Sequence, residues 1–266
     1  MASLAERAMS FGSIADDYDR FRSGPADAAV DWLVPADCAV AVDVGAGTGK
    51  LSRALQRLAG RVIAVEPDDR MRAVLQDRSP GVDVLAGRGE AIPLPDESAD
   101  GVFISSAWHW MDPELALPEI CRVLRDGGRF GVLWTSRDDS VGWVRDLNRL
   151  REPGERSPAG NPGTGQSADA GPTSRSLRHA VQMPGGGTPL HNVVTDTFSF
   201  TRPMTTGSLV EMLGTYSGLI TATPQDRAAR LDRVRAALEQ RFPGSEPIEV
   251  PMRSWCWRAD RASRAG

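Results

Sequence analysis

The sequence predicts an α/β fold in which short buried strands alternate with helices through a single domain of 266 residues. Apolar runs of strand length occupy residues 40–44, 61–66, 82–86 and 101–105, and turn or helical patterns separate them. A hydrophobic fraction of 41% with 25% charged residues is ordinary for a globular protein with a large core. The formal net charge of −4 offers no broad basic surface, so nucleic acid is not an expected partner.

The first strand, at residues 40–44, leads into a glycine-rich loop. Glycines stand at alternate positions after it, and a helical pattern over Lys50–Ala59 follows. Glycine permits a positive φ angle and leaves no Cβ atom between the main chain and a ligand, so the loop suits close contact with a polar small molecule. A bare structural turn is the alternative. The loop residues expected to contact the ligand are Asp43, Gly45, Ala46, Gly47 and Gly49.

The spacing of these glycines distinguishes between ligands. A dinucleotide-binding loop needs a small residue where this chain has Lys50. The observed pattern, D-x-G-x-G-x-G from Asp43 to Gly49, resembles motif I of the class I S-adenosylmethionine (SAM) dependent methyltransferases. The resemblance implies that the loop holds the methionine half of SAM.

An acidic residue ends the second strand. Arg61–Glu66 is apolar until Glu66, which lies 17 residues beyond Gly49. A carboxylate at this strand end has two oxygens that can accept both hydroxyls of a ribose, so we expect Glu66 to bind the ribose, with Pro67 beside it. The alternative is a solvated charge at a strand end.

A third motif spans the strands at Val82–Ala86 and Gly101–Ser105. Between them, residues 87–96 follow the pattern G-x-x-E-x-x-P-x-x-D, which resembles the family segment that lies against the adenine. Many relatives have an acid where this chain has Arg88. The resemblance therefore implies that backbone groups, rather than a side chain, contact the adenine here. The expected cofactor contacts in this region are Gly89, Glu90, Ala91 and Ser105. The next residues, W-H-W-M-D at 108–112, are similar to the type 11, trans-aconitate methyltransferase-like small-molecule branch.

Residues 1–35 are predicted to form an N-terminal helical cover. Phe11, Ala15, Tyr18 and Phe21 recur at helical spacing. The segment resembles the family's N-terminal cover, in which a tyrosine and an arginine approach the methionine end of the cofactor, and this implies contacts from Tyr18 and Arg22. A plain packing helix is the alternative for Tyr18.

The remaining elements follow in alternating order. Gly and Pro make residues 152–189 a flexible insert, which is either a lid or a disordered segment. The last two strands, with helices between them, match the sixth and seventh strands of the methyltransferase sheet. The resemblance therefore implies a Rossmann-like seven-stranded α/β/α sandwich, mostly parallel, with strand seven antiparallel. The predicted elements are helix Pro113–Leu124, a stop at 126–128, strand Arg129–Thr135, helix Val141–Leu150, strand Val193–Thr201, helices Met204–Tyr216 and Pro224–Phe242, and strand Ile248–Arg258.

The resemblance implies a methyltransferase that uses SAM as its cofactor and a small molecule as its O-, C- or N-acceptor, in a secondary-metabolite or lipid/quinone pathway. A non-methylating rearrangement on the same fold, or a binding protein without catalysis, would keep the same motifs. His109 follows the strand at 101–105 and is either a general base or a support of the pocket wall. Four tryptophans are expected either around the acceptor or in the core: Trp108, Trp110, Trp134 and Trp143.

Cysteine usage and hydropathy bear on location. Cys38, Cys121 and Cys256 are far apart and have no metal-ligand spacing, so we expect reduced thiols, no bound metal and a cytoplasmic protein. No stretch approaches the length of about 18 consecutive apolar residues that a membrane span needs, so no stable membrane insertion is expected. The oligomeric state is not predicted.

Overall fold

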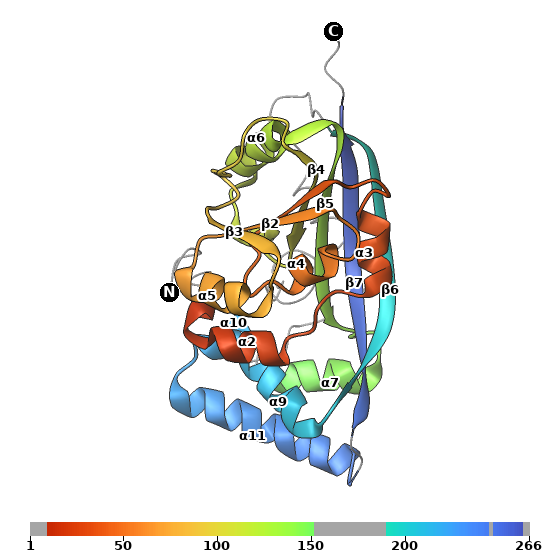
Figure 1. The fold of residues 1–266 in the computed structure, drawn as a ribbon. Coiled ribbons are helices and arrows are strands. Elements are labelled where there is room, and N and C mark those ends of the chain that lie inside the picture. The colour runs from red at the N-terminus through yellow and green to blue at the C-terminus, as the bar shows by residue number, and fades with distance from the viewer. Residues whose placement is uncertain (1–9, 152–189, 245–246, 263–266) are drawn as a thin grey trace. The chain divides into compact units, whose positions relative to one another are not determined.

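The computed structural model describes residues 10–151, 190–244 and 247–262 (Figure 1). These residues form two compact units. The described residues of the sheet unit come from 24–135, 190–198 and 254–262, and those of the helical unit from 10–23, 136–151, 199–244 and 247–253. The single domain over residues 1–266 stays a prediction, and the predicted insert at 152–189 lies outside the described residues. No helix within the described ranges is both long and apolar enough to cross a membrane.

Seven strands form one sheet in the order β3-β2-β1-β4-β5-β7-β6. Six strands run parallel and β7 is antiparallel, which confirms the predicted Rossmann-like sandwich with an antiparallel seventh strand. The strands are β1 Val40–Val44, β2 Arg61–Glu66, β3 Val82–Ala86, β4 Ala99–Ser105, β5 Leu124–Arg137, β6 Leu190–Met204 and β7 Ile248–Arg261.

Helices cover both faces of the sheet unit. Val42 lies in register with Ile63 of β2 and Val102 of β4, and these side chains share a core cluster with α6 (Pro113–Val123). Because side chains alternate along a strand, the next residue of β1, Asp43, faces the other side, where it contacts α4 (Lys50–Leu55). This second face also carries α3 (Asp27–Leu33) and α5 (Asp69–Arg78).

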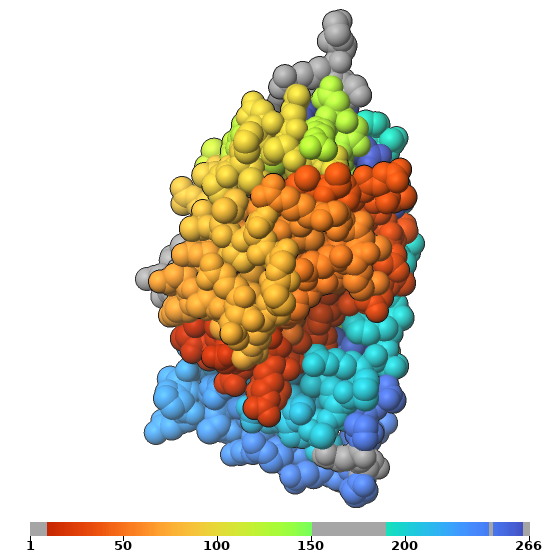
Figure 2. Space-filling model, in the orientation of Figure 1, coloured from red at the N-terminus to blue at the C-terminus, as the bar shows by residue number. Residues whose placement is uncertain are grey.

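The parallel register brings the carboxyl ends of β1, β2 and β4 together. Val44 at the end of β1 lies opposite Val65 of β2, and Asp43 lies opposite Phe103 of β4. The residues that follow these strands therefore meet at one edge of the sheet, the edge at which open α/β sheets bind ligands. In the space-filling view, the orange and yellow-orange segments that hold α4 and α5 form a continuous surface (Figure 2).

The helical unit has its own hydrophobic core. Leu209 and Leu213 of α9 pack with Val234 and Leu238 of α11, and the four side chains are almost completely buried. Thr223 caps α11 by accepting a hydrogen bond from the backbone N–H of Asp226. The helices of this unit are η1 Ser10–Ile14, α2 Ala15–Phe21, α7 Gly142–Arg151, α9 Thr206–Gly214, α10 Ser217–Ile220 and α11 Pro224–Arg241.

Some predicted boundaries differ from the structure. The predicted helix Lys50–Ala59 ends at Leu55. Strand β5 starts at Leu124 rather than Arg129, because Leu124 is extended and pairs with Ala99 of β4. The glycines at 127–128, expected to separate a helix from a strand, instead form an irregular stretch inside one long strand.

Candidate active site

The glycine loop follows β1 with all three glycines in the left-handed region, at φ angles of 69°, 57° and 86° for Gly45, Gly47 and Gly49. A Cβ atom on Gly45 would lie 2.7 Å from the Cβ atom of Ala107, and one on Gly49 would lie 2.7 Å from Ser79 Oγ. A Cβ atom on Gly47 would have no protein atom within 4 Å. Gly45 and Gly49 are therefore required for close packing of the loop against the protein. Of the three glycines, only Gly47 faces open space that a ligand can occupy.

Glu66 lies directly beside this loop. Its Oε2 accepts a hydrogen bond from Gly47 N at 2.8 Å, and its Oε1 accepts one from Asp68 N at 2.9 Å. Burial raises the pKa of Glu66, while the two backbone donors act in the opposite direction. A carboxylate offers about four lone-pair positions, so two N–H partners leave capacity for two hydroxyl donors. The structure thus brings the two predicted cofactor-binding elements together.

Asp43 lies fully buried beneath the loop. Its Oδ2 accepts a hydrogen bond of 2.6 Å from Ser52 Oγ in the first turn of α4. Its Oδ1, and the buried hydroxyl of Thr48 in the loop, have no hydrogen-bond partner among the described residues. Buried polar atoms are normally paired, so the loop retains hydrogen-bonding capacity that suits a polar ligand. Together with the open space at Gly47, this chemistry fits the cofactor that the sequence predicts.

The protonation of Asp43 should make stability depend on pH. Burial raises the pKa of Asp43 from 3.8 to about 7. The folded protein therefore holds this proton more tightly than the unfolded chain, and the contribution of Asp43 to the free energy of unfolding should fall as the pH rises between these values. Each unit of pKa shift is worth about 1.4 kcal/mol.

The comparison with Asp43→Asn isolates this contribution, because asparagine does not titrate. Urea unfolding at about pH 5 and about pH 8 should show the wild type losing more stability than the variant as the pH rises. A difference between the two proteins that stays constant with pH would show that Asp43 is already ionised in the fold.

The segment predicted to meet the adenine forms a tight turn. Ala91 N donates to the carbonyl of Arg88 at 3.0 Å, and the Arg88 side chain is exposed. Gly89 is buried, and a Cβ atom there would lie 2.5 Å from Met111 Sδ. A Cβ atom on Gly45 would also lie 3.1 Å from Met111 Cε, so Met111 packs between the glycine loop and this turn.

His109 belongs to the segment that follows β4. Ser105 ends the strand, and Ser106 adopts a φ angle of 55°, which is uncommon for a residue with a side chain. The chain then forms the short 3-10 helix η2 (Trp108–Trp110), in which the rings of His109 and Trp110 lie 4.5 Å apart. Both are half-buried. His109 is therefore at the ligand-binding edge of the sheet, as predicted.

The four tryptophans occupy different environments. Trp108 and Trp134 are buried in the core cluster of the sheet unit, and the Trp108 ring lies 5.6 Å from that of Phe130. This placement supports the core alternative for these two residues. Trp143 lies on α7 in the helical unit, with its ring 5.2 Å from that of Phe242. Pocket roles for Trp110 and Trp143 stay predictions.

Tyr18 and Arg22 also belong to the helical unit. The Arg22 guanidinium lies 3.6 Å from the ring centre of Tyr216 and 5.3 Å from that of Tyr18. Its Nε donates to Thr215 Oγ1 at 2.9 Å. The predicted approach of Tyr18 and Arg22 to the cofactor stays a prediction.

Two arginines that the sequence did not indicate brace the site. Arg53 donates to the carbonyl of Thr48 in the glycine loop at 2.8 Å. Arg72 donates to the carbonyls of Glu66 and Pro67, both at 2.8 Å. Arg53 lies four residues after Gly49, and this helical spacing, which turns a side chain back toward the loop, was the available signal.

Comparisons with known proteins agree on one family. Residues 42–132 match a family model described as a methyltransferase domain. An uncharacterized methyltransferase of Mycobacterium tuberculosis is 36% identical over 262 residues, covering 98% of this chain and 99% of that protein. A malonyl-[acyl-carrier protein] O-methyltransferase of Methylococcus capsulatus is 34% identical over 133 residues, covering 46% of this chain and 48% of that protein.

A solved structure has a similar fold. It belongs to a putative type II methyltransferase from Anaeromyxobacter dehalogenans and superposes with a TM-score of 0.64 at 22% identity. The match covers 91% of this chain and 98% of that one, so the likeness extends over nearly the whole fold.

Proposed function

This chain belongs to the methyltransferase family, and we propose that it transfers a methyl group from SAM to a small-molecule acceptor. The observation that carries the proposal is the hydrogen bond between Glu66 and Gly47, which joins an acidic strand end to the one open glycine of the loop. When bound, SAM supplies a methyl group on a sulfonium, which is already a good leaving group. The protein then has to hold the cofactor, align the acceptor and exclude water.

The residues of the sheet unit divide this work. Glu66 accepts the ribose hydroxyls, and Gly47 leaves room for the methionine half. The backbone of 89–91 meets the adenine. Many relatives have an acid that would bind the adenine at position 88, but this chain has an exposed arginine there, so backbone groups must make the contact. Glu66 remains in place without the cofactor because Gly47 and Asp68 hold its two oxygens. This preorganisation reduces the ordering that cofactor binding has to impose.

The acceptor is proposed to be a small molecule bound near His109 and Trp110. The formal net charge of −4 does not favour a nucleic-acid acceptor. The name of the Methylococcus capsulatus relative specifies O-methylation, which supports an oxygen acceptor without excluding carbon or nitrogen. If the acceptor is a hydroxyl or an acidic carbon, His109 can accept its proton. A role in secondary metabolism in the cytoplasm is part of this proposal.

The purified protein should bind SAM and S-adenosylhomocysteine with micromolar affinity, which corresponds to roughly −8 kcal/mol. Titration calorimetry measures this, and NADH serves as the control ligand because the loop departs from the dinucleotide pattern at Lys50. Incubation with methyl-labelled SAM and a metabolite extract should place the label in a small product. Binding of NADH and not of SAM would overturn the proposal, and SAM binding with an unlabelled product would exclude methyl transfer.

Gly47→Ala should weaken S-adenosylhomocysteine binding by at least about 10-fold, because the new Cβ atom enters the open space above the loop. Gly127→Ala is a matched control, since Gly127 also has a positive φ angle (73°) and no atom within 4 Å of an added Cβ. Both variants should lose about 1–2 kcal/mol of stability from the left-handed backbone. Calorimetry and urea unfolding test this, and equal ligand affinity in the two variants would contradict the role of Gly47.

A further inference from the structure

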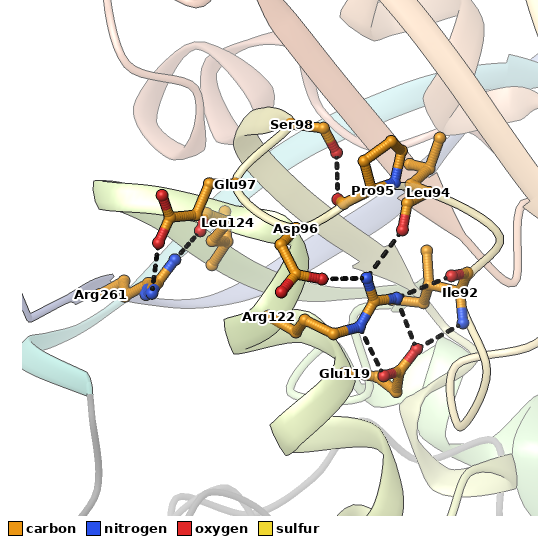
Figure 3. Close-up of polar contacts among 10 residues, drawn as sticks. All are labelled: Ile92, Leu94, Pro95, Asp96, Glu97, Ser98, Glu119, Arg122, Leu124 and Arg261. Carbon is orange, nitrogen blue, oxygen red and sulfur yellow. Dashed lines mark hydrogen bonds and ion pairs between the residues drawn. The ribbon is translucent and has the colours of Figure 1, made fainter.

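Arg122, in the last turn of α6, makes a dense set of contacts with Glu119 and with the loop that begins at Ile92 (Figure 3). Its Nε and Nη2 donate to the two carboxylate oxygens of Glu119 at 2.8 and 2.9 Å. The same guanidinium donates to the carbonyls of Ile92 and Leu94 at 2.9 and 2.8 Å. One side chain thus joins the end of a helix to the backbone of a loop 28–30 residues earlier in the chain.

Ile92 is held through both of its backbone groups. Its carbonyl accepts from Arg122, and its N–H donates to Glu119 Oε2 at 2.9 Å. The Ile92 side chain is buried in the core cluster, so it also anchors this point from within. Ile92 directly follows Ala91, the last residue of the proposed adenine turn. The Arg122–Glu119 pair therefore fixes the position from which that turn departs.

A second tether joins Glu90, inside the turn, to the same helix. Glu90 Oε1 accepts a hydrogen bond of 2.8 Å from the backbone N–H of Asp112, and Asp112 caps the N-terminus of α6. The turn is thus attached to α6 at Asp112 and again through Glu119 and Arg122. A rigid helix that holds two points of a short turn leaves its backbone little freedom.

Arg122 also donates to Asp96 Oδ1 at 2.8 Å, and two further arginines hold the next residue, Glu97. Arg125 donates to the carbonyl of Glu97, and Arg261 contacts the carboxylate of Glu97 and the carbonyl of Leu124 (Figure 3). These contacts begin five residues beyond Ile92. They stabilise the fold at the start of β4 and are separate from the turn at 88–91.

We propose that Arg122 is a positioning residue for the cofactor, which acts with Glu119 to hold the backbone of 89–91 in the conformation that reads the adenine. This inference rests on the proposed use of SAM. Arginine is required because five donors in a planar fork reach Glu119 and two carbonyls at once, whereas the three donors of a lysine share one nitrogen. The hydrogen bonds from Arg122 also lower the pKa of Glu119, so the pair stays ionised at neutral pH.

Arg122→Lys tests the proposal because it keeps the charge and loses the fork. The probe ligands are S-adenosylhomocysteine and S-inosylhomocysteine, whose purines differ along one edge: an amino group and an acceptor N1 in the first, an oxo group and an N1–H donor in the second. We expect the wild type to prefer the adenosyl compound. The variant should bind that compound about 10-fold more weakly while its affinity for the inosyl compound changes little, since the lost contacts position the backbone that reads the edge at which the two purines differ.

Arg125→Lys is the matched control, since Arg125 holds the far end of the same segment and has a comparable side-chain exposure of 46% against 31% for Arg122. It should lower stability without changing the preference between the two ligands. Glu119→Gln is a second variant that retains an acceptor for Ile92 N–H, and it should reduce the preference by a smaller factor than Arg122→Lys.

Equal weakening of both ligands by Arg122→Lys would overturn the inference, because a general loosening of the fold would then explain it. A wild type that binds both ligands equally would also overturn it. A wild type that binds neither ligand would refute the proposed function itself. Tight adenosyl binding that Arg122→Lys leaves intact would refute only the role of Arg122.

Discussion

Replacing Glu66 by alanine is expected to weaken the binding of SAM and S-adenosylhomocysteine by about 10²–10⁴-fold. The variant loses two ribose hydroxyl contacts, and a hydrogen bond to a charged group contributes about 1.5–3 kcal/mol. It also frees the backbone N–H of Gly47, which Glu66 holds at 2.8 Å, so the loop loses its support on the ligand side. The chain should still fold, because removing the buried carboxylate also removes the desolvation that raises the pKa of Glu66.

Titration calorimetry on the folded variant measures this loss, with circular dichroism to confirm the fold. Asp83→Ala is a suitable control, because Asp83 is an exposed acid on the neighbouring strand β3 that pairs with Arg61. The control should bind the cofactor like the wild type. Unchanged cofactor affinity in Glu66→Ala would mean that Glu66 only braces the glycine loop.

Three of the parallel strands could be predicted from the sequence with the correct ends, whereas β4 starts at Ala99, two residues before its predicted start. Strands at Val40–Val44, Arg61–Glu66 and Val82–Ala86 match the structure because each is a short apolar run that ends at a glycine or an acid. The start of β5 could not be predicted in this way. Asp126-Gly127-Gly128 has the composition of a turn, but Leu124 pairs with Ala99 and Arg261 bonds its carbonyl, so tertiary contacts extend the strand.

The roles of the predicted site residues also depend on tertiary contacts that the sequence does not reveal. Local sequence identifies the glycine loop, but which glycine faces a ligand depends on Ala107 and Ser79, which are far away in the chain. Similarly, a tryptophan after a strand suits either a pocket or a core, and Trp108 is buried because Phe130 packs against it. Arg122 has the sequence appearance of a solvated charge at a helix end, and only the folded chain brings Ile92 to it.

Replacing His109 by alanine is expected to lower kcat by about 10²–10⁴-fold while SAM affinity stays nearly intact, if His109 is the general base. Its place after β4, at the ligand-binding edge of the sheet, supports this role. The tilted stacking of its ring on Trp110 at 4.5 Å supports the other role, a support of the pocket wall. A wall residue would instead show a raised KM for the acceptor and a lower thermal stability.

The pH profile separates the two roles because only a base has to lose its proton before it can act. With a base, wild-type activity should fall as the pH drops through the range in which an imidazole gains its proton, around pH 6–7. The variant should lack this acid limb. His191→Ala is the control, since His191 is exposed on β6 and should leave both kcat and the profile unchanged. A His109→Ala enzyme that retains the acid limb of the wild type cannot have lost its base, and His109 would then be a wall residue that supports the acceptor pocket.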